Sequence, residues 1–390
     1  MEINDIKNLE KVAIVCVGYN RLKSLARLTA SLLKAEYPVS GVPLVISIDC
    51  SNNEEIYSFA ENFKWQFGEK YVFIQPVRLG LKEHIYKCGN LTEYFKAIIL
   101  LEDDLVVSPV FYSYVLKCLD RYAGDPRIAQ ISLYKNEING YVGFPFDNLK
   151  TGADLFLMQD VSTWGECWTA AMWNDFTEWR DSHSEEDVLG IDMPDEIKGW
   201  TRAWSKYYNA YVADTGKFVL YPDVSVTTNF SDAGEHGGDR NAYVQVSLLQ
   251  NDFDYRMPEF EKLVRYDIFF NNLDMPGWLG IDSKEICLDI YGFNRRPHKN
   301  QKYLLSPLVL PYRKIRGFAA NMRPIELNIK NGIEGNDIFL YEIQGSEIEC
   351  KKKYSKGFLN YFLCIYQPVQ LVRFSMNWVR RQIFRKLGIK

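Results

Sequence analysis

The chain has 390 residues, of which 47% are apolar and 15% aromatic, and its formal net charge is −4. This composition excludes wholesale disorder, and the length suits one large domain or two ordinary ones. Eight scattered cysteines without a CxxC pair argue against a disulfide framework or a zinc site. A general nucleic-acid binder is excluded as well, because the predicted folded part of the chain is acidic.

Short apolar runs rich in β-branched residues predict strands in the amino-terminal third of the chain. These runs are Val12–Val17, Val42–Asp49, Tyr71–Gln75, Ile98–Leu101 and Ile128–Leu133. Helical patterns lie between them, including one helix capped by Ser51 or Asn52 and one opened by Ser108-Pro109 that runs to Tyr122. The alternation predicts an α/β fold with a doubly wound, mainly parallel sheet of the Rossmann-like kind.

Three consecutive carboxylates, Glu102, Asp103 and Asp104, follow the fourth predicted strand. Adjacent acids repel each other, and burying them without partners is costly. Open α/β sheets bind their ligands at the carboxyl ends of the strands, so we expect a divalent cation at this point. A solvated acidic turn is the alternative.

Polar residues also follow the other predicted strands, and the sheet should bring all of them to one edge. The predicted donor-binding residues are Asn20, Arg21, Asp49, Arg78, Lys82, His84, Glu102 and Asp103. Cations and acids around one crevice suit a ligand made of phosphate, metal and sugar. The chain has no GxxxxGK[ST] loop, and no GxGxxG turn follows the first strand, which argues against the P-loop and dinucleotide classes.

Six tryptophans lie within residues 164–204, where they can form a carbohydrate-binding surface or an ordinary aromatic core. We favour the core for most of them. The acidic stretch Asp187–Glu196 precedes Trp200 and is expected to border an acceptor site. The glycine-rich loop Asn229–Arg240 contains His236, which is predicted to ligate a metal or a phosphate, with an ordinary loop histidine as the alternative.

We divide the chain into a catalytic domain of residues 1–255, with a donor half of about 10–135 and an acceptor half of about 136–255, and an accessory region of residues 256–349. Within that region, short alternating runs in residues 282–349 predict a small β-rich appendage, and the residues before it, up to 281, look like a partly helical linker. Residues 350–390 hold ten Lys or Arg and no Asp or Glu. They predict a basic amphipathic helix that binds an anionic membrane surface, unless it docks on its own domain. No apolar leader is evident, so we expect a cytoplasmic protein, peripheral on the inner face of the cytoplasmic membrane.

Several short segments follow one another in an order that resembles that of bacterial glycosyltransferases of the GT-A fold (family 2-like). Those enzymes are similar to the N-acetylglucosaminyltransferase I group. The resemblance covers about residues 10–240. The segments are GYNR, SIDC, RLGLKEHI, ILLEDDLVVSPVFYSYV, STWGECW, the pair Trp200 and Trp204, and LYPDVSVTTNFSDAGEH. The segment around Glu102–Asp104 is the most specific of them.

The resemblance implies that Asp104 ligates the metal, usually Mn²⁺, with Mg²⁺ as the alternative, and that His236 lies in a loop that closes over the donor. It implies the remaining donor contacts as follows: Arg21 with the diphosphate, Asp49 with a uracil-type base, His84 with that base or its surroundings, and Glu102 and Asp103 with the sugar and ribose.

Relatives carry an Asp, the candidate general base of an inverting mechanism, just before the first tryptophan of the W-x-x-x-W pair. Here Lys198 and Gly199 occupy that stretch. The candidate bases are therefore Glu196 and Asp195, with Glu166 of the STWGECW segment as a further candidate, and the stereochemical outcome is open.

These observations predict a metal-dependent glycosyltransferase, transferring a hexosyl or N-acetylhexosaminyl group from a nucleotide-diphosphate sugar, UDP-type favoured. The acceptor is expected to be a hydroxyl of a glycan or a lipid-linked molecule in surface polysaccharide synthesis. Two alternatives stay open: a sugar nucleotidyltransferase, and a non-catalytic carbohydrate-binding or assembly protein with a decayed site.

Overall fold

The computed structural model describes residues 8–232, 244–293, 295, 297–343, 353–364, 367, 369, 372–373, 375–376 and 379–380. The chain forms two compact units, Met1–Asp274 and Met275–Lys390. Residues 256–274, in which the predicted accessory region begins, belong to the first unit. No helix within the described residues is both long and apolar enough to cross a membrane.

A nine-stranded sheet forms the centre of the first unit, in the order β13-β9-β11-β6-β10-β4-β1-β2-β3. Its strands are β1 (Asn8–Gly18), β2 (Leu44–Ile48), β3 (Lys70–Ile74), β4 (Phe95–Glu102), β6 (Ile128–Ser132), β9 (Leu155–Met158), β10 (Glu166–Thr169), β11 (Phe218–Pro222) and β13 (Arg265–Tyr266).

The pairing within this sheet is mostly parallel. Strands β3, β2, β1 and β4 run parallel to one another, as do β6 with β11 and β9 with β13. Strand β10 is antiparallel to both of its neighbours, and β9 is antiparallel to β11. Residues Ala13–Cys16 of β1 are fully buried, which explains their continuous apolar sequence. The predicted α/β class with a large, mainly parallel sheet is confirmed.

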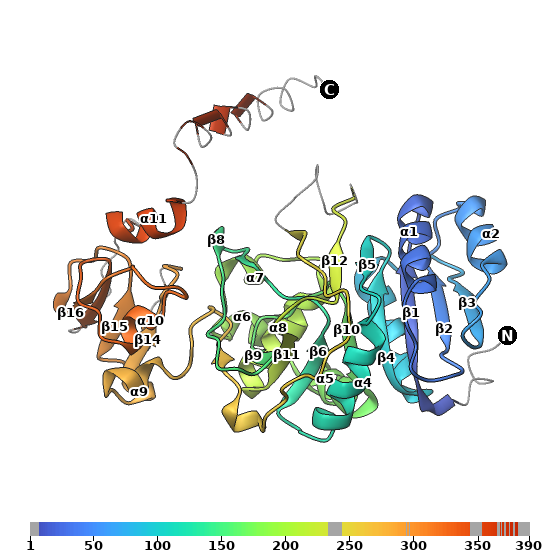
Figure 1. The fold of residues 1–390 in the computed structure, drawn as a ribbon, viewed down its shortest axis with the longest axis horizontal. Helices are drawn as coiled ribbons and strands as arrows, with labels where there is room; N and C mark the ends of the chain where they lie inside the picture. Colours follow the sequence, from blue (N-terminus) through green and yellow to red (C-terminus); the bar gives the residue numbers. More distant parts are fainter. Residues whose placement is uncertain are drawn as a thin grey trace. The chain divides into compact units, whose positions relative to one another are not determined.

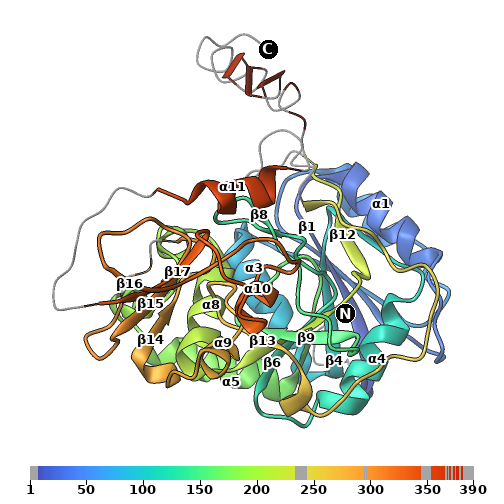
Figure 2. The ribbon, with the colours of Figure 1, turned by 60° about the vertical axis from the view of Figure 1, so that its left-hand side comes forward.

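Helices cover both faces of this sheet. They are α1 (Leu22–Leu33), α2 (Glu54–Asn62), α3 (Leu81–Gly89), α4 (Phe111–Tyr122), α5 (Ala170–Ser182), α6 (Glu185–Gly190), α7 (Asp195–Lys198) and α8 (Trp204–Thr215). Short 3₁₀ turns lie at Asn90–Glu93 and Phe260–Lys262. Figures 1 and 2 show α1 and α4 on one face and α3, α5 and α8 on the other.

Two predicted helix starts were wrong. The side chain of Asn53, rather than that of Ser51 or Asn52, caps α2 by accepting from the N–H of Glu55 at 3.1 Å. Helix α4 begins at Phe111 and not directly after Ser108. The Oγ of Ser108 accepts from the N–H of Val110 at 3.2 Å, in a turn that precedes the helix.

Most tryptophans of the aromatic region belong to the core, as predicted. Trp168, Trp173, Trp179 and Trp204 are buried between the sheet and helices α5 and α8. Trp164 and Trp200 are only partly buried.

The second unit contains a four-stranded sheet in the order β14-β15-β17-β16, which confirms the predicted β-rich appendage. Its elements are α9 (Met275–Leu279), a 3₁₀ turn (Ser283–Glu285), β14 (Ile286–Leu288), β15 (Tyr303–Ser306), β16 (Arg313–Phe318), α10 (Leu327–Lys330), β17 (Ile338–Glu342) and α11 (Lys356–Leu363). Phe358, Tyr361 and Phe362 of α11 are buried, so this helix is packed onto the unit.

Candidate functional site

The strand order reverses beside β1, which lies between β2 and β4. Val17 of β1 pairs with Glu102 of β4, so the chain segments that leave these two parallel strands begin side by side. Ligands of open α/β sheets bind at such a reversal, outside the carboxyl ends of the strands. The segments are Gly18–Arg21 after β1 and Glu102–Asp104 after β4.

Arg21 joins these two segments by pairing with two carboxylates. Its guanidinium donates to both oxygens of Asp103, through Nε at 3.3 Å and through Nη2. The same group donates to Oδ2 of Asp104, through Nη1 at 3.1 Å and Nη2 at 3.2 Å. Asp103 is only 3% exposed, so Arg21 supplies the counter-charge that water cannot supply there.

Two carboxyl groups of this cluster, those of Glu102 and Asp103, are shifted toward their protonated forms. Burial raises the pKa of Asp103 to about 6, although the nearby charge of Arg21 acts in the opposite direction. Burial, followed by the charges of Asp104 and Asp103, raises the pKa of Glu102 to about 8. The same two aspartates raise the pKa of Arg21 above its ordinary value despite burial. Burial therefore favours the protonated form of Glu102.

Asp49, at the end of β2, holds the loop that leads into α3. Its Oδ1 accepts from the N–H groups of Leu79 at 2.8 Å and Cys50 at 2.9 Å, and its Oδ2 accepts from the N–H of Gly80 at 2.9 Å. The side chain is buried. Asp49 thus positions the β3–α3 loop at the reversal, and its predicted contact with a base stays a prediction.

His84 lies in the core beneath this loop. Its Nε2 is 2.7 Å from Oγ of Ser47, and burial lowers its pKa to about 4, so the imidazole is neutral. The other predicted donor residues lie nearer the surface: Arg78 covers the ring of Tyr19 at 4.7 Å, Lys82 Nζ lies 4.1 Å from the ring centre of Tyr207, and Asn20 is exposed.

A second ion pair lies next to the first, and the sequence analysis did not predict it. The short strand β12 (Thr227–Asn229) pairs with β5 (Leu105–Val107), which places Phe230 beside Asp104. The N–H of Phe230 donates to the carbonyl of Asp104 at 2.8 Å. Asp232 then accepts from Oγ of Ser24 at 2.6 Å and pairs with Arg27.

The charge of Asp232 also contributes, after burial, to raising the pKa of Asp103, so the two ion pairs interact electrostatically. Ser24 and Arg27 lie one turn apart on α1, the helix that starts directly after Arg21. That spacing could have indicated, from the sequence, that α1 has a polar face near the site. The position of Asp232 could not be predicted in this way, because it depends on the β5–β12 pairing.

Glu166 is fully buried on β10, next to β4. Its Oε2 accepts from the N–H of Gly165 at 2.9 Å, and its Oε1 has no hydrogen-bond partner within the described part of the chain. Burial, together with the charge of Glu102, raises its pKa well above the ordinary value. Burial therefore favours the protonated form of Glu166, and its strand lies beside the strand that ends at Glu102.

Asp195 and Glu196 lie in the first turn of α7, and both are exposed. Glu196 lies near Tyr141 and contributes to raising the pKa of that phenol, chiefly a burial effect. No contact joins Asp195 or Glu196 to the acidic cluster among the residues described, and their role as base stays a prediction.

Asp104 is the described carboxylate that best fits a divalent cation. Its side chain is 17% exposed and its Oδ1 makes no hydrogen bond within the described residues, whereas both oxygens of Asp103 are bound to Arg21. His236, the other predicted ligand, lies outside the described residues. No group of three His, Cys, Asp or Glu side chains gathers into a cage in the described regions. The residues fit Mg²⁺ or Mn²⁺ bound by one carboxylate together with substrate phosphates.

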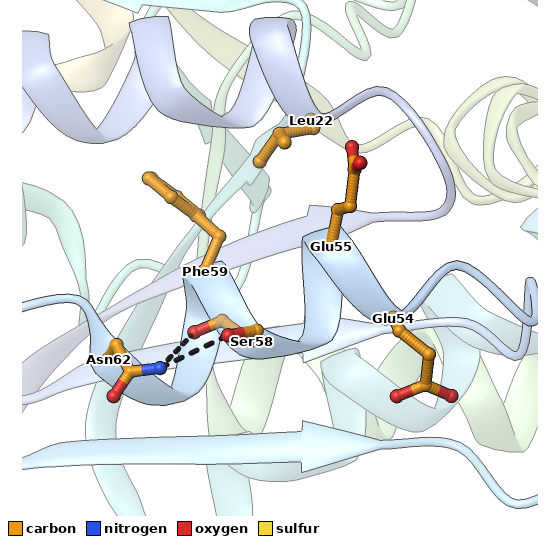
Figure 3. A pocket seen from close by; sticks show the side chains of 6 residues that line it. All are labelled: Leu22, Glu54, Glu55, Ser58, Phe59 and Asn62. Atoms are coloured by element: carbon orange, nitrogen blue, oxygen red, sulfur yellow. Dashed lines mark hydrogen bonds between the residues drawn. The ribbon is translucent and has the colours of Figure 1, made fainter.

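A shallow pocket of about 560 Å³ lies between α1 and α2 (Figure 3). Its walls are formed by Leu22, Glu54, Glu55, Ser58, Phe59 and Asn62. This lining contains two exposed acids and no cation, so it does not suit a nucleotide diphosphate. The candidate site is therefore the cluster around Arg21.

No family model and no curated protein match this chain. Solved structures with distant similarity include Staphylococcus aureus TarS 1–349 (14% identity, TM-score 0.37, 57% of this chain and 60% of that chain) and the Pyrobaculum calidifontis mannosyltransferase PcManGT in complex with GDP-Man and Mn²⁺ (11%, 0.38, 60% and 61%). GalNAc-T7 with UDP, GalNAc and Mn²⁺ is a third (14%, 0.39, 56% and 43%). The matched region spans about 60% or less of each of these chains.

Proposed function

We propose that this protein is a glycosyltransferase that takes a sugar from a nucleotide-diphosphate donor, UDP-type favoured, and transfers it to a hydroxyl of a glycan or lipid-linked acceptor in surface polysaccharide synthesis. The observation that supports this proposal most directly is the meeting of Arg21 with Glu102, Asp103 and Asp104 at the strand-order reversal. The PcManGT and GalNAc-T7 structures named above contain GDP-Man and UDP respectively, but the proposal rests on the residues of this chain.

The charges of the cluster match the parts of such a donor. Arg21 is a permanent cation that can bind diphosphate oxygens. Glu102 and Asp103 have carboxyl groups that can hydrogen-bond to hydroxyls of the sugar and ribose. Asp104, with His236 as the predicted second ligand, would hold Mn²⁺ or Mg²⁺, which stabilises negative charge on a leaving diphosphate.

In the transfer, the bond between the anomeric carbon and the diphosphate breaks, the acceptor oxygen bonds to that carbon, and the acceptor proton passes to a base. Asp195 and Glu196 are exposed carboxylates, which are able to accept this proton. Glu166 is less suited to this role, because it is fully buried and burial raises its pKa. We therefore favour Glu196 or Asp195 as the base.

Isothermal titration with UDP, with and without Mn²⁺, tests the donor site. We expect Asp104→Asn to lose Mn²⁺-dependent UDP binding, whereas Asp120→Asn, which changes an exposed acid of α4, should bind as the wild type does. Normal binding by Asp104→Asn would refute the metal assignment. Hydrolysis of UDP-, GDP- and dTDP-sugars then distinguishes an active transferase from a decayed site.

We also propose that the tail places the enzyme on the inner face of the cytoplasmic membrane. Val369, Val372, Met376 and Val379 recur at helical spacing and are exposed. Basic residues of the same segment complement an anionic surface, to which each contributes about 1 kcal/mol near the headgroups.

Co-sedimentation with vesicles of phosphatidylglycerol, and of phosphatidylcholine as the neutral comparison, tests this location. We expect Val372→Asp combined with Met376→Asp to release the protein from the anionic vesicles. Ser375→Asp adds a single negative charge to the same segment without removing an apolar side chain and should have a smaller effect. Unchanged sedimentation of the double variant would rule out the apolar face as the anchor.

A further inference from the structure

Two partly exposed aromatic side chains lie near each other in the first unit, apart from the donor cluster. Tyr141 belongs to the turn between β7 (Ile138–Asn139) and β8 (Phe144–Pro145), and Trp200 belongs to the loop between α7 and α8. Their ring centres are 6.4 Å apart, and their planes are inclined by 34°. Trp200 is thus an exception in a region whose tryptophans are mostly buried.

The phenol of Tyr141 is held in place by a buried acid. Its hydroxyl donates to Oδ1 of Asp160 at 2.5 Å, and Nδ2 of Asn136 donates to Oδ2 of the same carboxylate at 3.2 Å. Asp160 is 5% exposed and Asn136 is buried as well. The ring of Phe270 meets the ring of Tyr141 edge-on, with centres 6.1 Å apart. The orientation of Tyr141 is therefore fixed before any ligand binds, which lowers the entropy cost of binding.

This pair lies on the side of the sheet where the donor cluster lies. Asn136 follows the carboxyl end of β6, and β6 is separated from β4 only by β10. Figure 1 shows β8 and α7 along the same edge of the sheet as β5 and β12. A molecule bound at Tyr141 and Trp200 would thus be on the same edge as the donor.

The chemistry of the pair suits a sugar ring. The C–H face of a pyranose stacks on aromatic rings, and its hydroxyls donate to carboxylates. Glu196 supplies such a carboxylate, because it is exposed and lies near Tyr141. Buried and exposed acids around the pair favour a neutral sugar over an anionic one.

We infer that Tyr141 and Trp200 form a binding subsite for a neutral pyranose of the acceptor, with Glu196 at its border and Asp160 as the residue that positions Tyr141. The part of this inference that calls the sugar an acceptor rests on the proposed function. Sugar binding by the pair can be measured without any transfer reaction.

Saturation-transfer NMR with methyl β-glucoside, methyl β-galactoside and methyl β-N-acetylglucosaminide tests the subsite in the full chain. We expect the wild type to give transfer with at least one glycoside and Trp200→Ala to lose it, with Trp200→Phe retaining part. Trp278→Ala, which removes a partly exposed tryptophan of the second unit, is the matched control and should leave the transfer unchanged. No transfer with the wild type, or equal transfer with Trp200→Ala, would overturn the inference.

Positioning by Asp160 is tested by comparing acceptor KM with kcat. We expect Tyr141→Ala and Trp200→Ala to raise the acceptor KM about tenfold with little change in kcat. Asp160→Asn should raise it less, and Tyr141→Phe should retain most of the affinity because the ring remains. A change confined to kcat would contradict a binding role for the pair.

UDP binding measured on the same variants separates the two proposals. Wild-type UDP binding together with lost glycoside binding in Trp200→Ala supports the subsite and also shows that the variant is folded. Glycoside binding by a protein that binds no nucleotide would leave the sugar subsite standing and refute the transferase.

Discussion

Arg21 and Asp103 form a pair in which the guanidinium donates to both carboxylate oxygens, across the carboxyl ends of two parallel strands. The pairing of Val17 with Glu102 brings together the segments that leave these two strands, so the sheet places Arg21 near Asp103. The pair therefore links the stability of the fold to the electrostatics of the donor site.

Replacing Arg21 by Gln should destabilise the protein. Removing one partner leaves a buried charge uncompensated, which costs about 3–5 kcal/mol for a fully buried pair. Since the Arg21 side chain is 24% exposed, we expect a smaller loss, roughly 2–3 kcal/mol. Denaturant unfolding measures it, and Arg21→Gln combined with Asp103→Asn should recover part of the loss. Strictly additive effects would show that the pair does not couple.

Asp160 should make stability depend on pH between about 4 and 7. Burial raises its pKa from an ordinary value of 3.8 to about 7, so the folded state favours the protonated acid. The stabilisation is present below the unfolded pKa and is lost as pH rises to the folded pKa. Unfolding free energies from pH 4.5 to 7.5 should fall less steeply for Asp160→Asn than for the wild type. Identical slopes would place the pKa of Asp160 near its ordinary value.

His84 should make the protein less stable as pH falls, which is the opposite of the effect expected from Asp160. Its pKa falls from 6.5 to about 4 through burial, so the folded state binds fewer protons than the unfolded state. The contribution of His84 to the free energy of unfolding is fully present above the pKa of the unfolded state. It declines as pH falls toward 4, by at most about 1.4 kcal/mol per pH unit. His84→Gln should remove this contribution to acid sensitivity. Urea unfolding at pH 7, 6 and 5 tests the difference, with His183→Gln, a partly exposed histidine, as the comparison.

Gly89→Ala should loosen the packing of α3 against α5. A Cβ at this position would come within 2.0 Å of the indole of Trp173, whose Nε1 donates to Asn90 at 2.8 Å. Overpacking of this kind costs about 1–3 kcal/mol. Gly124→Ala, where an added Cβ meets no atom within 4 Å, is the matched control. Thermal unfolding should separate the two variants, and equal midpoints would contradict the close contact.

Strand positions were predictable because a strand segment buried on both faces must be continuously apolar, as Val12–Val17 of β1 and Ala97–Leu101 of β4 are. The helix caps were less predictable. Asn53 has several polar neighbours that can also cap a helix, and only the path of the chain decides which side chain reaches the free N–H groups. The insertion of β10 antiparallel between β4 and β6 left no signal in its own four residues.

By itself, the sequence determined the fold class, the placement of polar residues at strand ends and the crowding of three acids after β4, since these depend on local composition and on the geometry of a parallel sheet. Only the tertiary structure decided what each side chain contacts. It paired Arg21 with Asp103 and Asp104, used Asp49 to hold a loop, and buried Glu166. It also brought Asp160 to Tyr141. Such contacts join residues distant along the chain, and burial, which sets their charge, is a property of the whole fold.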